Sequence, residues 1–291
     1  MNNWGKWGPQ DERGALNYIA SEQMVRAAGL VRRGRVYPLA LPVQQHKVPV
    51  FPGRAPALHF MTMDGGDYAA GHKAKGGFQY TDDYLVLACH AGTHMDALAH
   101  VCSEGTMYNG FPAVEVRSYG ARRGGIDKVG AIFTRGVLLD LAGLHGVPHL
   151  PAQHEVVAAD LDACCRAQGV SVGPGDAVLL RTGWLTLYER DPMGFDREQP
   201  GLGLDSVPWF AERQVSVIAA DNTAVEKVPA RHGEELFPVH VRLLRDLGIY
   251  LMELLDLEAL ARDRVHEFLF VAAPLRITGG VGSPLTPLAV V

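Results

Sequence analysis

The chain has 291 residues, of which 47% are hydrophobic and 20% charged, a balance typical of folded globular proteins and not of disordered or fibrous ones. With 27 basic against 32 acidic side chains the formal net charge is −5, which offers no chain-wide basic surface for a nucleic-acid backbone. No stretch approaches the roughly eighteen uncharged apolar residues that span a bilayer, and the N-terminus lacks the apolar core of a signal peptide. We therefore expect a cytoplasmic protein that binds neither nucleic acid nor a membrane.

The pattern along the chain predicts one α/β domain, residues 35–291, preceded by an extension, residues 1–34. The extension contains a helical pattern over residues 21–34, with Ser21 as the expected N-cap and Gly34 as its end. Apolar and β-branched runs predict strands at Val36–Leu41, Tyr84–Cys89, Gly136–Leu141, Ala177–Thr182, Val215–Ala220, Ile249–Leu254 and Phe268–Ala272. Helical patterns lie between them at His154–Gln168, Ser206–Arg213, Val239–Leu247 and Leu257–Arg262. No linker or repeat divides the chain further.

One short segment, YLVLACHAGTHMDALAH at residues 84–100, concentrates residues that bind metals. The predicted strand ends at His90, and the following Ala91-Gly92 step allows the backbone to turn. His94 and Asp96 are two residues apart, so both point to the same face of an extended segment. Two imidazoles and one carboxylate suit Zn²⁺, Mn²⁺ or Fe²⁺ and leave coordination positions open for water and substrate. The spacing therefore predicts a catalytic metal site.

His100 lies four residues after Asp96. If the chain becomes helical after Asp96, the imidazole of His100 lies back over the metal centre, where it can serve as a base. The alternative is that these histidines are ordinary core or surface residues. Three histidines and an aspartate at this spacing, next to a glycine and a strand end, favour the metal site.

The string HAGTHMDALAH resembles the HxGTHxDxxxH signature of the cyclase family of metal-dependent hydrolases, which includes kynurenine formamidase and isatin hydrolase. Further similar segments are LLRTGW at 179–184, WFAERQVSVIAADN at 209–222, PVHVRLLRDLGIYLMEL at 238–254 and APLRITGGVGSP at 273–284. The resemblance covers residues 35–291, and the piece with GPQDERGALNYI looks like the longer branch of the family. It implies the family's swivelling β/β/α fold, in which helices pack against a curved, mixed, barrel-like sheet.

By this resemblance, His90, His94 and Asp96 correspond to the ligands of the primary metal, expected to be zinc or manganese. His100 corresponds to the histidine that acts as general acid and base.

In two-metal members of the family a second ion shares the aspartate and takes a later histidine and glutamate, which correspond here to His240 and Glu253. The interval between these two residues departs by one position from the family pattern, so one ion per chain is expected and two are the alternative. His240 also fits an exposed helical position. Glu253 lies in the apolar run IYLMELLDL, where an ionised carboxylate needs a metal, a histidine or an arginine beside it. This favours a catalytic or metal-binding role for Glu253.

Four further residues are weaker candidates for substrate binding. Phe60, Tyr108 and Trp184 flank the signature or the RTGW segment and are candidates to line an aromatic pocket, although aromatic residues near strand ends often belong to the core. Asp221 ends the VSVIAAD strand, where it either reaches the site or caps the following turn.

Together these residues predict a metal-dependent hydrolase. We expect it to cleave a small amide, formamide, cyclic imide or lactone by attack of metal-bound water, with His100 moving the proton. This mechanism needs no serine nucleophile, because water is the attacking group. Two alternatives stay open: a metal-dependent lyase or cyclase acting on a polyketide-like or hydroxy-acid substrate, and a non-catalytic metal-binding protein.

Proteins of this family generally associate, so the resemblance also implies a homo-oligomer, a dimer or tetramer. The apolar, proline-rich segment Val48–Met63 is a candidate for the interface.

Overall fold

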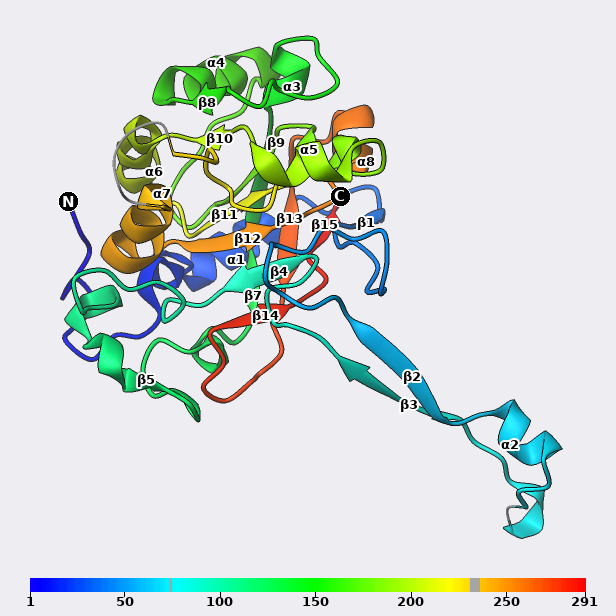
Figure 1. Ribbon diagram of the computed structural model, residues 1–291. Coiled ribbons are helices and arrows are strands. Elements are labelled where there is room, and N and C mark those ends of the chain that lie inside the picture. The colour runs from blue at the N-terminus through cyan, green and yellow to red at the C-terminus, as the bar shows by residue number, and fades with distance from the viewer. Residues whose placement is uncertain (74, 231–235) are drawn as a thin grey trace.

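The computed structural model describes residues 1–73, 75–230 and 236–291, and over these residues the core is a nine-stranded mixed sheet (Figure 1). The strand order is β1-β15-β13-β7-β9-β11-β12-β4-β14. The neighbours from β7 to β12 run parallel, and both flanks of the sheet are antiparallel. The strands are β1 (Val36–Pro38), β4 (His94–Asp96), β7 (Ile132–Asp140), β9 (Ala177–Arg181), β11 (Val217–Ala220), β12 (Tyr250–Glu253), β13 (Glu267–Ala272), β14 (Gly282–Pro284) and β15 (Leu288–Val290).

Short ribbons and helices surround this sheet. The two-stranded ribbons are β2 (Leu58–Met63) with β3 (Asp82–Val86), β5 (Val116–Arg117) with β6 (Gly120–Ala121), and β8 (Glu155–Val156) with β10 (Gly201–Leu202). The α-helices are α1 (Ser21–Ala28), α2 (Gly65–Ala69), α3 (Leu141–Leu144), α4 (Ala158–Gln168), α5 (Pro192–Arg197), α6 (Val207–Glu212), α7 (Pro238–His240) and α8 (Glu258–Arg262). The 3₁₀ turns are η1 (Gly14–Tyr18), η2 (Lys75–Gly77), η3 (Tyr108–Gly110), η4 (Ala113–Glu115), η5 (Ile126–Lys128), η6 (Trp184–Leu187) and η7 (Leu204–Ser206), and η8 (Val241–Leu247) is a π-helical continuation of α7.

Three of the four parallel strands are buried along their whole length. Every residue of β9, β11 and β12 is buried, which is why their sequences are nearly continuous apolar runs instead of alternating ones. Helices α1 and α4 pack against β7, and η8 packs against β12. The predicted α/β fold with helices on a mixed sheet is confirmed.

Two predicted helices begin or end differently in the structure. The first ends at Ala28, with Gly29 as its C-cap, and not at Gly34; Ser21 is its first helical residue and Ala20 its N-cap. The helix predicted at His154–Gln168 begins at Ala158, because Glu155 and Val156 pair as β8 with β10.

The strand predicted at Tyr84–Cys89 is the largest difference. It is β3, which spans Asp82–Val86, pairs with β2 and stays outside the main sheet. All of its residues are exposed. With α2 at its tip, this hairpin, which we call the arm (residues 58–73 and 75–86), projects away from the body of the molecule (Figure 1). His90 therefore lies in a turn beyond the arm and not at a strand end.

The N-terminal residues pack against the same core as the rest of the chain. Ala15 and Leu16 are buried in it, and the indole nitrogen of Trp4 donates a hydrogen bond to the carbonyl of Arg245 at 2.8 Å. The boundary at residue 34 stays a prediction. In the described ranges no helix combines the length and the apolar character that crossing a lipid bilayer requires.

Candidate metal centre

Strand β4 carries two of the predicted ligands on one face. His94 and Asp96 alternate with Met95, which is fully buried, so the two polar side chains share the other face of the strand. The register places His94 opposite Glu253 on β12. As a result, Nε2 of His94 lies 3.3 Å from Oε2 of Glu253 and 3.5 Å from Oδ1 of Asp96.

Two glycines allow the side chain of His90 to enter. Gly92 adopts a φ of 61°, a left-handed conformation that reverses the loop between His90 and β4. Gly282 on β14 pairs with Asp96, and a Cβ at this glycine would lie 2.3 Å from Nε2 of His90. Because that space is empty, the imidazole of His90 comes within 3.4 Å of Oδ1 of Asp96.

His100 reaches the cluster through a turn; the chain does not become helical after Asp96. Its amide donates to the carbonyl of Ala97 at 2.9 Å, and its Nε2 lies 4.0 Å from Oδ1 of Asp96. Its ring stacks on that of His90, with 4.2 Å between centroids. Burial lowers the pKa of His100 below its usual 6.5, although Asp96 opposes this. The imidazole is therefore neutral near pH 7, and at 25% exposure its side chain is the most accessible of the cluster.

His240 enters the same cluster from the end of α7. Its Nε2 lies 3.2 Å from Oε1 of Glu253 and 3.8 Å from Oδ2 of Asp96. Its Nδ1 lies 2.5 Å from Oε1 of Glu226, which also accepts the amide of His240 at 2.8 Å. Glu226 is buried, and no pattern in the sequence singles it out. A carboxylate that accepts Nδ1–H directs the Nε2 lone pair of His240 into the cluster.

The unpaired atoms of the cluster fit a divalent cation. Nε2 of His90, Nε2 of His94 and both carboxylate oxygens of Asp96 are buried without a hydrogen-bond partner, whereas most buried polar atoms have one. The separations of 3.4 and 3.5 Å from Asp96 equal the edge of about 3.4 Å between donors that surround one zinc ion tetrahedrally. Donor atoms within 4.8 Å of one another form two groups, one with His90 and His100 and one with His94 and Glu253, and both contain Asp96.

The charges of the cluster also favour a cation. Burial disfavours ionisation of Asp96 and Glu253, but the surrounding histidines outweigh it and hold the pKa of both carboxyl groups below the usual range. Burial lowers the pKa of His90 to about 4. For His94 and His240 burial acts in the same direction, but the close carboxylates outweigh it and raise the pKa to about 10: Asp96 and Glu253 for His94, Glu226 and Glu253 for His240. A cation bound by His94 would therefore displace a proton from its imidazole, and a second ion bound by His240 would do the same there.

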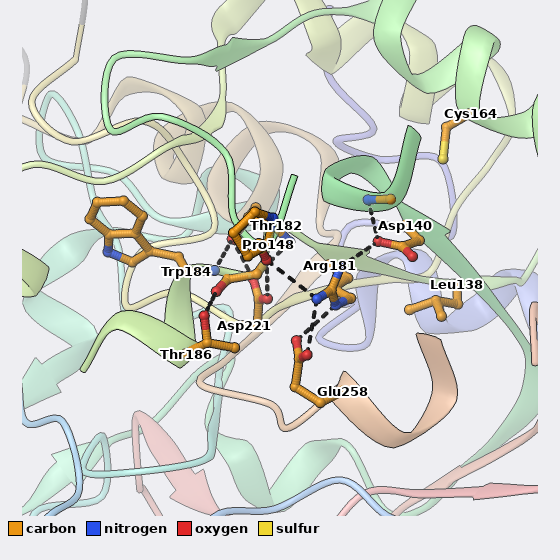
Figure 2. A network of polar contacts seen from close by, with 12 residues as sticks. Leu138, Asp140, Pro148, Cys164, Arg181, Thr182, Trp184, Thr186, Asp221 and Glu258 are labelled. Atoms are coloured by element: carbon orange, nitrogen blue, oxygen red, sulfur yellow. Dashed lines mark hydrogen bonds and ion pairs between the residues drawn. The ribbon is translucent and has the colours of Figure 1, made fainter. Parts of the chain in front are cut away.

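The structure places Asp221 and Trp184 in other contacts (Figure 2). Asp221 is buried and accepts hydrogen bonds from the amide and hydroxyl of Thr182 and from the amide of Gly183. Trp184 donates its indole N–H to the carbonyl of Phe195 at 3.2 Å and stacks on that ring. Among the described residues, no hydrogen bond, ion pair or ring contact joins either side chain to the cluster, and their roles in substrate binding stay predictions.

Phe60 and Tyr108 also lie elsewhere. Phe60 is half-exposed on the arm, where it stacks on Tyr84 with 6.0 Å between centroids. Tyr108 is buried, and its hydroxyl donates to Oδ2 of Asp11 at 2.9 Å, which fastens the N-terminal residues. A role of either in substrate binding is likewise untested.

The aromatic residues that do approach the cluster are ones the sequence did not single out. The ring of Phe237 lies 5.5 Å from that of His240 and 6.0 Å from that of Phe51. Arg54 lies 5.2 Å from the Phe51 ring and donates to the carbonyl of His90 at 2.8 Å. Phe51 and Arg54 are far from His240 along the chain, so only the folded structure shows that these residues and Phe237 lie beside the cluster.

The chain is similar to known proteins over most of its length. The chain matches the family model described as "Putative cyclase" over residues 37–227, a range that holds His90, His94, Asp96 and His100 but neither His240 nor Glu253. A crystal structure of a novel cyclase superposes with a TM-score of 0.93 at 40% identity, covering 100% of both chains. Isatin hydrolase of Roseibium aggregatum is 26% identical over 216 residues, 72% of this chain and 74% of its own. Isatin hydrolase A from Ralstonia solanacearum, at 21% identity and a TM-score of 0.66 over 93% of this chain and 97% of its own, shares the fold.

Proposed function

This chain belongs to the Cyclase family, and we propose that it is a metal-dependent hydrolase of a small amide, formamide, cyclic imide or lactone. The observation that carries the proposal is the set of buried, unpaired donor atoms around Asp96. The likeness to isatin hydrolase, whose substrate is a cyclic amide, supports cleavage of a C–N bond other than a peptide bond.

The residues assigned to the cation are His90, His94 and Asp96, and zinc or manganese suits this donor set. When bound there, the cation polarises a carbonyl group and lowers the pKa of a water molecule toward neutrality. The protein fixes the ligands beforehand: Nδ1 of His94 lies 2.9 Å from the carbonyl of Gly92, which leaves the lone pair on Nε2. One ion per chain is expected.

A second ion is the alternative, and His240 and Glu253 would hold it together with Asp96. The contact between Nδ1 of His240 and Glu226 supports this assignment, because it directs Nε2 toward Glu253. Without a second ion, Glu253 acts by holding the rings of His94 and His240 in place.

His100 is proposed as the group that moves the proton. It is neutral near pH 7, and it is the most accessible side chain of the cluster. Its Nε2 accepts a proton from the attacking water and returns it to the leaving nitrogen or oxygen. A metal-storage role would need no such group, which argues against a non-catalytic protein.

A lyase or cyclase acting on a hydroxy-acid or polyketide-like substrate is the second candidate. It is favoured by the description of the 40% identical relative as a cyclase. The same cation would stabilise an enolate instead of a tetrahedral oxyanion.

Chelator-treated protein reloaded with zinc or manganese tests the proposal on a panel of isatin, aryl formamides, cyclic imides and lactones. We expect turnover of at least one compound, dependent on added metal and absent in the His94→Ala variant. If the metal-loaded protein hydrolyses none of these compounds but eliminates water from a β-hydroxy acid, the protein is a lyase and not a hydrolase.

A further inference from the structure

A second group of metal-ligating side chains lies where α3 meets α4 and is distinct from the cluster around Asp96. Figure 1 shows α3 and α4 next to each other, away from β4. His145 directly follows α3, His154 directly precedes β8, and Asp160 lies in the first turn of α4. One donor atom from each residue lies within 4.8 Å of the others. Segments separated along the chain thus bring two imidazoles and one carboxylate to one point.

The contacts between these donors resemble those in the metal centre. Nε2 of His154 lies 3.6 Å from Oδ2 of Asp160, close to the 3.4 and 3.5 Å that separate the histidines from Asp96. The same Nε2 is buried and has no hydrogen-bond partner. The ring of His145 lies 5.3 Å from that of His154, on the side open to solvent.

We propose that His145, His154 and Asp160 bind a first-row divalent cation such as Zn²⁺, Ni²⁺ or Co²⁺, which ties α3 to α4. Two imidazoles and a single carboxylate favour these ions over Mg²⁺ and Ca²⁺, which prefer oxygen ligands. The exposure of His145 leaves the remaining coordination positions to water. The site shares no residue with the cluster around Asp96, so the inference does not depend on the proposed function.

An ion pair between His154 and Asp160 is the competing explanation. It requires a protonated His154 and gives no role to His145. Asp160 is already held in place, since its Oδ2 accepts the amide of Val157 at 3.0 Å. For this reason Asp160 is left intact in the test, because its loss would also remove the contact that begins α4.

The test counts zinc ions per chain by equilibrium dialysis of the chelator-treated protein, followed by elemental analysis. The His145→Ala and His154→Gln variants should each bind one ion fewer than the wild type. His72→Ala, which removes another exposed histidine, is the matched control and should bind as many ions as the wild type. If His154→Gln fails to fold, His145→Ala decides alone, because His145 is exposed.

A second measurement separates this site from the metal centre. In the His94→Ala chain, zinc should still raise the melting temperature, and the added His145→Ala change should abolish that rise. Equal zinc binding by the wild type and both surface variants, or an unchanged rise in the double variant, would overturn the proposal. Loss of turnover in His94→Ala bears on the proposed function and leaves this result unaffected.

Discussion

Among single residues, His100 is the one whose chemistry can be separated from metal binding. It is farther from Asp96 than the other imidazoles of the signature, at 4.0 Å, and its side chain is partly exposed. Replacement by asparagine should leave the metal content unchanged and lower turnover by about 10² to 10⁴, the usual share of general acid and base catalysis. The loss should appear in kcat more than in KM, because the proton moves in the transition state.

Steady-state kinetics and elemental analysis of the same His100→Asn preparation check this prediction. A variant that loses its metal would make His100 a ligand, in keeping with its place in one donor group with His90 and Asp96. A variant with full turnover would remove His100 from the mechanism.

Gly282 tests whether the space beside His90 is required. An alanine Cβ would lie 2.3 Å from Nε2 of His90, closer than any real contact, so the imidazole must move away from Asp96. We expect Gly282→Ala to fold normally and to bind zinc at least 10-fold more weakly, in line with the cost of disturbing a ligand's supports. Isothermal titration measures this. Gly65→Ala is the control, because nothing lies within 4 Å of its added methyl group; equal affinity in both variants would show that His90 is not a ligand.

The sequence reveals the residues of the site that stand close together along the chain. His90, His94 and Asp96 share a short loop, so their spacing alone predicts that they meet. Glu226 and Gly282 belong to no such pattern. Glu226 acts by contacting His240 of α7, and Gly282 acts because β14 pairs with β4. The GGVGSP segment gives no sign that its last glycine faces a histidine.

At the level of secondary-structure elements, the side chain of Arg181 links strand β9 to helix α8 and strand β7 (Figure 2). From the end of β9 it donates two hydrogen bonds to Glu258 on α8, at 2.7 and 2.9 Å, and one to Asp140 of β7 at 2.8 Å. Arg181 is buried, so its removal leaves the carboxylate of Asp140 without its cationic partner. Arg181→Met should lower the free energy of unfolding by about 2 to 4 kcal/mol, somewhat less than for a fully buried pair because Glu258 is 40% exposed.

Denaturant unfolding of Arg181→Met beside Arg262→Met checks this value. Arg262 pairs with Asp263 at 67% exposure, and its loss should change the free energy of unfolding by less than about 1 kcal/mol. If both variants lower the free energy of unfolding by the same amount, the buried network around Arg181 stabilises the fold no more than an exposed ion pair does.

The elements themselves were predictable where burial and periodicity agree. Strands β9, β11 and β12 are apolar throughout because both of their faces are covered, and the sequence placed them within a few residues. β3 has a similar apolar run, Tyr84, Leu85 and Val86, but this run lies on an exposed hairpin. Composition alone cannot distinguish a strand buried in the sheet from one that a second chain would cover.

At the scale of the whole molecule, the arm is the feature that a single chain leaves unsupported. Phe60 is 50% and Tyr84 61% exposed, and a two-stranded ribbon is marginally stable in water by itself. We propose that a second copy of the chain covers this surface, which would make the protein a dimer or tetramer. Light scattering should give such a mass for the wild type, and Phe60→Ser with Tyr84→Ser should shift it toward the monomer. A monomeric wild type at micromolar concentrations would refute the proposal.

An anomalous difference map can show whether His90, His94 and Asp96 hold a divalent cation. Crystals of the protein soaked in zinc or manganese would be measured at the absorption edge of that metal, so that each ion is located and not merely counted. We predict a peak about 2.0 to 2.2 Å from Nε2 of His90, Nε2 of His94 and a carboxylate oxygen of Asp96. A map that shows these side chains well ordered, with no anomalous peak between them, would contradict it.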